Sequence, residues 1–250
     1  MIDFHNHIIP KIDDGAKSFE MALKMAQKAY HDNTDCIVNT VHLNHPTVKN
    51  SDFETIIKRK KELENMLKEE NITIEIISAA EVYFNSNLLE LSHQPIATVK
   101  NKFMLIEFNP NFLSPIIDDI FFQLKCSGIY PIIAHPERYR FVQNDISIVK
   151  KWIDKDYFIQ LNAGSIMGFA GKMMQKTAFS LLKNEYCHLV GSDAHNNQNL
   201  NFCLKDSLAK IERKFGPDCV EIINKNSTKL LNGEDLIPIK SLTKKKYWFF

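Results

Sequence analysis

Short apolar stretches alternate with longer amphipathic ones along this chain. The short stretches are rich in Ile, Val, Leu and Phe, a composition typical of strands that are buried on both faces of a sheet. They predict seven strands, at Met1–Phe4, Cys36–Val41, Thr73–Ala79, Phe103–Ile106, Ile129–Ala134, Tyr157–Leu161 and Cys187–Gly191.

Helical periodicity occupies many of the intervals between these strands. Apolar residues from Phe19 to Tyr30 recur every three or four positions, and Ser18 is available as an N-cap. Further helices are expected at Phe53–Glu70, Ile116–Cys126, Ile146–Ile153, Met173–Asn184, Phe202–Phe215 and Asp218–Leu231. The repeated strand–helix order predicts an α/β fold with a parallel sheet. Seven strands with flanking helices favour a barrel, and an open doubly wound sheet remains the alternative.

Side chains that can bind metal ions stand where the predicted strands end. They are His5 and His7, His42, Glu81, Glu107, His135, and the pair Asp193 and His195, with Asn162 after the sixth strand. The carboxyl ends of parallel strands meet at one edge of a sheet, which is where α/β proteins build their sites. The two-residue spacing of His5 and His7 also places both side chains on one face of an extended segment.

Such a cluster predicts divalent cations. Carboxylates brought together in a buried site raise one another's pKa and destabilise the fold unless positive charge lies among them. A mixed nitrogen and oxygen ligand set without thiolates suits Mn, Fe or a catalytic Zn, with Co also possible. Two or three ions are expected if Glu81 bridges. A water molecule between such ions becomes hydroxide near neutral pH and can attack phosphorus.

Composition and charge narrow the picture further. The net charge of +1 supplies no electrostatic reason to expect nucleic acid as the partner. The five cysteines are scattered, without a C-x-x-C pair or a C-x5-R phosphate loop, so we expect neither disulfides nor a cysteine nucleophile. No signal peptide and no run of about 18 apolar residues is evident. We therefore expect a cytoplasmic protein without stable membrane insertion.

Several motifs together resemble the polymerase-and-histidinol-phosphatase (PHP) superfamily. The motifs are D-F-H-N-H-I-I-P-x-I-D-D-G-A at the start, then A-E, H-P-E-R-Y and G-S-D-A-H. Within the superfamily the chain is most similar to metal-dependent protein-tyrosine phosphatases of bacterial capsule and exopolysaccharide operons, the CpsB/YwqE type. The likeness runs from residue 1 to about residue 235. It implies a distorted seven-stranded (β/α) barrel, TIM-like, that holds three metal ions and typically depends on manganese.

The resemblance also implies how the ligands are shared. One ion would be held by His5, His7, Glu81 and Asp193, a second by Glu81, Glu107 and His135, and a third by Asp14, His42 and His195, with Asp13 as the alternative to Asp14. The forked guanidinium of Arg138 would hold the phosphate, and Arg140 is a weaker candidate for that role. Arg138, Asp193 and His195 are the expected catalytic residues. The implied reaction is direct attack by metal-bound hydroxide, without a phospho-enzyme.

The expected substrate is phosphotyrosine in a protein, with a bacterial tyrosine kinase of polysaccharide export as the partner. One alternative is a PHP phosphatase that acts on a small molecule such as histidinol phosphate. Another is a binding protein that regulates a kinase without hydrolysis. A carbon–nitrogen hydrolase with a similar barrel is a third, although no lysine is placed to form a carbamylated bridge. The oligomeric state stays open.

The chain departs from the family pattern in two places. Val41 precedes His42 where the family usually has proline. After Glu81 the family often has an aromatic pair, and here Val82 precedes Tyr83 and Phe84, which could alter the wall of the substrate cleft. The histidines outside the motifs are expected to pack in the core or lie on the surface; they are His31, His45, His93 and His188. Residues 1–240 are expected to form a single domain. The basic and aromatic tail 241–250 is expected to pack on that domain or on a second subunit, or to be disordered.

Overall fold

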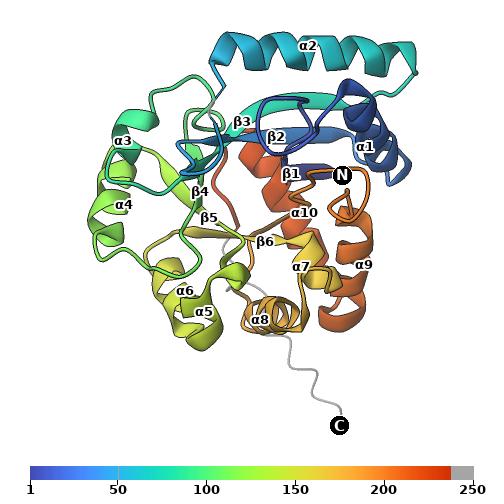
Figure 1. The fold of residues 1–250 in the computed structure, drawn as a ribbon. Coiled ribbons are helices and arrows are strands. Elements are labelled where there is room, and N and C mark those ends of the chain that lie inside the picture. Colours follow the sequence, from blue (N-terminus) through green and yellow to red (C-terminus); the bar gives the residue numbers. More distant parts are fainter. Residues whose placement is uncertain (50, 238–250) are drawn as a thin grey trace.

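Parallel strands form the centre of the molecule. A computed structural model describes residues 1–49 and 51–237, so the tail at 241–250 and the domain boundary at 240 lie outside the described residues. The strands are β1 (Ile2–Asn6), β2 (Cys36–Leu43), β3 (Glu75–Tyr83), β4 (Phe103–Glu107), β5 (Tyr130–Ala134), β6 (Phe158–Asn162) and β7 (Leu189–Gly191). They pair in chain order as one seven-stranded parallel sheet (Figure 1).

The sheet closes on itself between its first and last strands. The backbone N–H of Asp193 donates to the carbonyl of His5 at 2.6 Å, and that of His7 donates to the carbonyl of Ala194 at 2.9 Å. A single parallel bridge between Asn6 and Ala194 completes the junction. The result is a nearly closed barrel, and the open doubly wound sheet is excluded.

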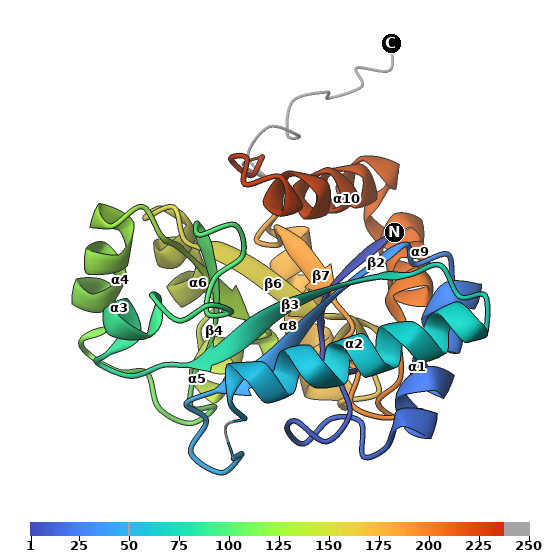
Figure 2. The same cartoon turned by 90° about the horizontal axis from the view of Figure 1, so that it is seen from above.

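Helices surround the barrel, as Figures 1 and 2 show. They are α1 (Phe19–His31), α2 (Phe53–Glu69), α3 (Leu88–Leu91), α4 (Ile117–Cys126), α5 (Arg140–Asn144), α6 (Ser147–Ile153), α7 (Ala163–Met167), α8 (Lys172–Lys183), α9 (Leu204–Phe215) and α10 (Pro217–Leu231), with a 3₁₀ turn η1 (Pro136–Arg138). The hydroxyl of Ser18 accepts from the N–H of Met21 at 3.1 Å, which confirms the predicted cap. The elements α3, α5, α7 and η1 are absent from the sequence prediction because they are too short to show a period.

An apolar layer fills the barrel toward the amino ends of its strands. Phe4, Val38, Leu105 and Ile132 come from four different strands and belong to one buried cluster. Leu230 of α10 joins this cluster, and α10 packs against β1 and β7 (Figure 2). This end of the barrel is therefore filled with side chains, and its opposite mouth is where polar groups can gather.

The alternation of side chains along a strand then places polar residues at that mouth. Side chains two residues apart share a face of a strand. His42 therefore shares the face of Val38 on β2, because it lies four residues further along. Glu107 shares the face of Leu105 on β4, because it lies two residues further along. On β3, Glu81 lies directly beside His42 in the parallel register. On β2, β3 and β4 the periodicity that builds the apolar floor therefore also presents candidate ligands. On β1 the candidate ligand His5 directly follows Phe4, and the register with β2 is irregular between Asp3 and Asn6.

Several strands run further than their apolar pattern predicted. β1 continues to Asn6, β2 to Leu43 and β3 to Tyr83. His5, His42 and Glu81 therefore lie within strands, and the prediction that they follow their strands is wrong. A polar side chain at the barrel mouth interrupts the apolar run but leaves the backbone ladder intact. Val41 pairs with Ala80 in that ladder, in the position where the family usually has proline.

Among the described residues no helix is long and apolar enough to span a bilayer.

Close packing at the β7–β1 junction predicts that Gly191→Ala is destabilising. A Cβ at this position would lie 2.5 Å from the Cβ of His5 and 2.7 Å from Nε2 of Gln160. We expect a loss of roughly 1–3 kcal/mol in the free energy of unfolding, the usual cost of overpacking. Thermal or denaturant unfolding measures it.

The matched control is Gly128→Ala. Gly128 has a φ of +78° and no atom within 4 Å of its would-be Cβ, so only backbone strain of about 1 kcal/mol applies there. Equal losses in the two variants would show that packing against His5 does not restrict residue 191.

Candidate metal centre

The structure brings all the sequence-predicted ligands together at the carboxyl mouth of the barrel. They form three overlapping groups: His5, His7, Glu81 and Asp193; Glu81, Glu107 and His135; and His7, Asp14, His42 and His195. Within each group the candidate ligand atoms lie within 4.8 Å of one another. The first two groups match the sets that the family resemblance implied, and the third adds His7 to its set.

Glu81 joins the first two of these groups, and His7 joins the first to the third. The carboxylate of Glu81 is buried, with Oε2 lying 3.1 Å from Nε2 of His5 and 3.4 Å from Nδ1 of His42. Its other oxygen, Oε1, lies 2.9 Å from Nε2 of His135. The two oxygens therefore face different imidazoles, which is the arrangement required of a carboxylate that bridges two ions.

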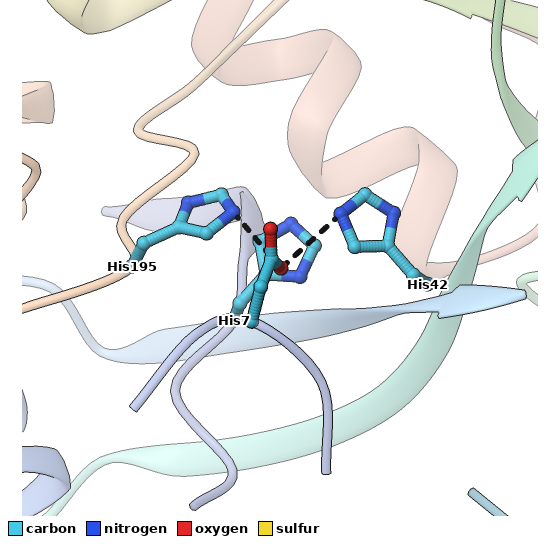
Figure 3. A group of neighbouring side chains, drawn as sticks. His7, His42 and His195 are labelled. Carbon is cyan, nitrogen blue, oxygen red and sulfur yellow. Dashed lines mark ion pairs between the residues drawn. The ribbon is translucent and has the colours of Figure 1, made fainter. Parts of the chain in front are cut away.

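The neighbouring residues Asp13 and Asp14 make different contacts around the third group. Figure 3 shows the ring of His7 between those of His195 and His42. Oδ1 of Asp14 lies 3.4 Å from Nε2 of His42 and 3.5 Å from Nε2 of His195. Asp13 instead holds Nδ1 of His7 at 2.9 Å through Oδ2. The geometry thus favours Asp14 as a ligand and gives Asp13 a supporting position.

Hydrogen bonds behind the imidazoles orient them. Nδ1 of His5 lies 3.1 Å from Oε1 of Gln160, and Nδ1 of His195 lies 2.8 Å from the carbonyl of Asp193. Together with the bond from Asp13 to His7, these contacts fix the outer nitrogen of each ring and turn the other nitrogen toward the cluster. The sequence reasoning missed Gln160, although it lies one inward position before Asn162 on β6.

Arg138 and Asn162 both hold the outer oxygen of Asp193. Nη2 of Arg138 lies 2.6 Å from Oδ2 of Asp193, and Nδ2 of Asn162 donates to the same atom at 3.1 Å. Oδ1 of Asp193 faces Nε2 of His5 at 3.3 Å. Arg138 is partly exposed, so its guanidinium is accessible from the mouth. Arg140 is exposed at the start of α5, where its backbone N–H donates to the carbonyl of Pro110 at 2.8 Å.

Two of the candidate ligands have a left-handed backbone, with φ of 33° at His135 and 54° at Asp193. The conformation at His135 is doubly unfavourable because proline follows it. Non-glycine residues in this region cost of order 1–3 kcal/mol and persist only where the surroundings hold them. The buried Tyr139 is one such support, since its hydroxyl donates to the carbonyl of Ala134 at 2.7 Å and accepts from the N–H of Phe108 at 3.0 Å.

The electrostatics of the cluster fit bound cations. Burial, with the charges of Glu81 and Asp193, raises the pKa of Glu107 to about 9. Within the part of the chain that the structure describes, the buried Nε2 atoms of His5 and His7 and Oε2 of Glu107 make no well-aligned hydrogen bond, although oppositely charged groups lie close to them. Buried polar atoms without hydrogen bonds are costly, and here they converge with their lone pairs available for a cation. Nitrogen and carboxylate donors without thiolates suit Mn, Fe, Co or a catalytic Zn.

His45 lies beside the cluster, although no sequence motif pointed to it. Its Nε2 lies 3.7 Å from Oε2 of Glu107, and its ring meets Tyr83 edge-on with centroids 5.2 Å apart. With His42 and Glu107 it forms a further group of potential ligands. Its signal in the sequence was only its closeness to His42.

Val82, whose departure from the family pattern could have altered the cleft, is instead buried in the main core.

The remaining histidines behave as expected. His31 and His93 are exposed. His188 is buried, and its Nδ1 accepts from the backbone N–H of Ile159 at 3.1 Å. Burial lowers the pKa of His188 to about 3. These three residues therefore have surface or packing positions away from the metal-binding groups.

A parallel barrel with imidazoles and carboxylates gathered at its carboxyl mouth defines the class of TIM-like metal-dependent hydrolases. The chain belongs to the capsular polysaccharide synthesis family CpsB/CapC, whose family model matches residues 1–232. This confirms the resemblance noted in the sequence.

Known relatives align with most of this chain. Identity to the tyrosine-protein phosphatase YwqE of Bacillus subtilis is 28% over 254 residues, covering 100% of both chains. Identity to the tyrosine-protein phosphatase CpsB of Streptococcus agalactiae is 30% over 228 residues, covering 87% of this chain and 92% of that protein. A crystal structure superimposes on this chain with a TM-score of 0.90 at 27% identity, covering 95% of this chain and 96% of the other. It comes from work on YwqE of B. subtilis and CpsB of Streptococcus pneumoniae, which are described there as unique metal-dependent tyrosine phosphatases. The barrel prediction is confirmed.

The different positions of Asp13 and Asp14 predict different losses of metal. Asp14→Asn should remove one bound ion per chain, because it removes the carboxylate that faces His42 and His195. Asp13→Asn should keep the number of ions but weaken binding roughly 10–100-fold, the usual effect of losing a group that orients a ligand. Metal analysis and manganese titration of the purified variants distinguish the two results. Loss of an ion in Asp13→Asn but not in Asp14→Asn would make Asp13 the ligand.

Proposed function

We propose that this chain is a metal-dependent protein-tyrosine phosphatase of capsule or exopolysaccharide synthesis. The observation that carries this proposal is the set of ligand groups joined at Glu81, with an arginine at its edge, in a chain related over most of its length to tyrosine-protein phosphatases. The pairing of Arg138 with Asp193 places a guanidinium fork, suited to phosphate oxygens, directly beside a candidate ligand.

The three ligand groups would hold up to three divalent cations, and we propose manganese as the physiological ion. When bound, such cations lower the pKa of a coordinated water molecule and neutralise charge on the phosphoryl oxygens. His5, His7, Glu81 and Asp193 would hold one ion, Glu81, Glu107 and His135 a second, and Asp14, His42 and His195 a third. The supports for these assignments are the distances within each group and the unpartnered Nε2 atoms of His5 and His7.

The protein's own contribution to the reaction is orientation. Arg138 is proposed to hold two phosphoryl oxygens and to stabilise the charge that they carry as the ester bond breaks. Asn162 and Arg138 together fix Asp193, and the carbonyl of Asp193 fixes the ring of His195. This connection supports the grouping of Arg138, Asp193 and His195 as catalytic residues. Arg140 stays a weaker candidate for phosphate binding.

A direct attack on phosphorus, without a phospho-enzyme, agrees with the state of the cysteines. All five are free and none belongs to a ligand group. Cys203 lines the same pocket as Arg138, but burial raises its pKa to about 12. A thiol with that pKa is protonated at neutral pH and is a poor nucleophile.

We propose that the substrate is phosphotyrosine on a bacterial tyrosine kinase that controls polysaccharide export, and that both act in the cytoplasm. The support is the capsule-synthesis family together with the tyrosine phosphatases among its relatives. Dephosphorylation of candidate kinases from the source cell, followed with a phosphotyrosine antibody, tests this partner.

The proposed reaction predicts hydrolysis of phosphotyrosine peptides that depends on a divalent ion. Manganese-loaded protein should release phosphate from such a peptide, and EDTA should abolish release until manganese is restored. A parallel assay with histidinol phosphate separates the two PHP-type activities. Faster turnover of histidinol phosphate would reject the protein substrate, and absence of turnover with every phosphate ester would favour a regulator that does not hydrolyse.

Arg138→Lys tests the guanidinium fork. Lysine keeps the positive charge but loses the planar pair of donors, so we expect kcat/KM for the peptide to fall at least about tenfold. At saturating manganese the number of bound ions should stay that of the wild type, because Arg138 orients the candidate ligand Asp193 but is not itself in a ligand group. Arg140→Lys is the matched comparison, with an expected change below about twofold. A larger loss in Arg140→Lys would exchange the roles of the two arginines.

A further inference from the structure

Two large apolar side chains are exposed beside Arg138. Phe169 is 62% exposed and Leu200 is 49% exposed. Both line the same pocket as Arg138 and Asp193. Single exposed apolar residues are common, but two that share a pocket with a candidate metal ligand form a local surface suited to an apolar ligand.

Backbone hydrogen bonds hold both residues in place. The N–H of Phe169 donates to the carbonyl of Gly164 at 2.9 Å. The carbonyl of Leu200 accepts from the N–H of His195 at 2.8 Å and from that of Asn196 at 3.1 Å. Leu200 is thus joined through the main chain to a candidate metal ligand, so its position relative to the metal-binding groups is set by the fold.

The order of the chain places these residues at the mouth that holds the ligands. Arg138 follows β5, Phe169 follows β6 and α7, and Leu200 follows β7. All three belong to segments that leave the carboxyl ends of neighbouring strands, as do the ligands themselves. Because Arg138, Phe169 and Leu200 line one pocket, a phosphate held there by Arg138 would share that pocket with the two apolar side chains.

We propose that Phe169 and Leu200 form a subsite for the aromatic ring of phosphotyrosine, an inference that rests on the proposed function. In phosphotyrosine the ring is bonded directly to the ester oxygen, so it lies immediately beside the phosphate. Contact with an aromatic and an aliphatic side chain removes apolar surface of the ring from water. Phosphoserine and phosphothreonine have only a small aliphatic group there, so the subsite favours aryl esters.

Two phosphonates that differ only in the ring test this subsite without requiring turnover. Calorimetric titration of manganese-loaded protein gives the Kd values of phenylphosphonate and methylphosphonate, and their ratio isolates the contribution of the ring. In the wild type we expect phenylphosphonate to bind roughly tenfold tighter. Phe169→Ala and Leu200→Ala should each reduce that ratio about threefold or more, and Phe169→Leu should retain part of it.

Phe122→Ala is the matched control, because Phe122 is 68% exposed on α4 and does not line the pocket of Arg138. Its ratio should equal that of the wild type. An unchanged ratio in both Phe169→Ala and Leu200→Ala, or an equal fall in Phe122→Ala, would overturn the subsite. Failure of wild-type protein to hydrolyse any phosphotyrosine peptide would instead reject the proposed function, so the two failures remain distinguishable.

Discussion

The carboxylate of Glu81 lies buried among imidazoles, and the architecture of the barrel mouth depends on how that charge is compensated. Burial alone raises the pKa of Glu81, but the surrounding His5 and His135 outweigh it, and the pKa lies well below the usual range. At Glu107, burial and the charges of Glu81 and Asp193 outweigh the opposing effect of Arg138, and the pKa is raised to about 9. Buried carboxylates at this density require opposite charge, from protonated imidazoles or from metal ions.

The barrel meets this requirement by keeping its two ends chemically separate. Phe4, Val38 and Leu105 belong to an apolar cluster that Leu230 joins from outside the strands. The faces of β2 and β4 that carry Val38 and Leu105 end in His42 and Glu107 at the mouth. This arrangement concentrates the charge where ions and phosphate can reach it.

Rigidity at the mouth comes from residues outside the candidate ligand groups. Asp13, Gln160 and Asn162 fix the orientation of candidate ligands through single hydrogen bonds. Tyr139 links the ends of β4 and β5 and supports the left-handed turn at His135. Such supports explain how a site that contains strained backbone and buried charge can persist in a folded chain.

The sequence alone determined the β–α order and the candidate ligands near the strand ends, and it favoured a barrel without excluding an open sheet. Those features depend on local periodicity and on residue types at strand ends, which neighbouring residues along the chain already reveal. Only the tertiary structure distinguished Asp14 from Asp13, because adjacent aspartates differ in the direction of their side chains and not in their pattern. It also revealed Gln160, His45, Phe169 and Leu200. Their positions depend on contacts between segments far apart in the chain, and no local pattern records such contacts.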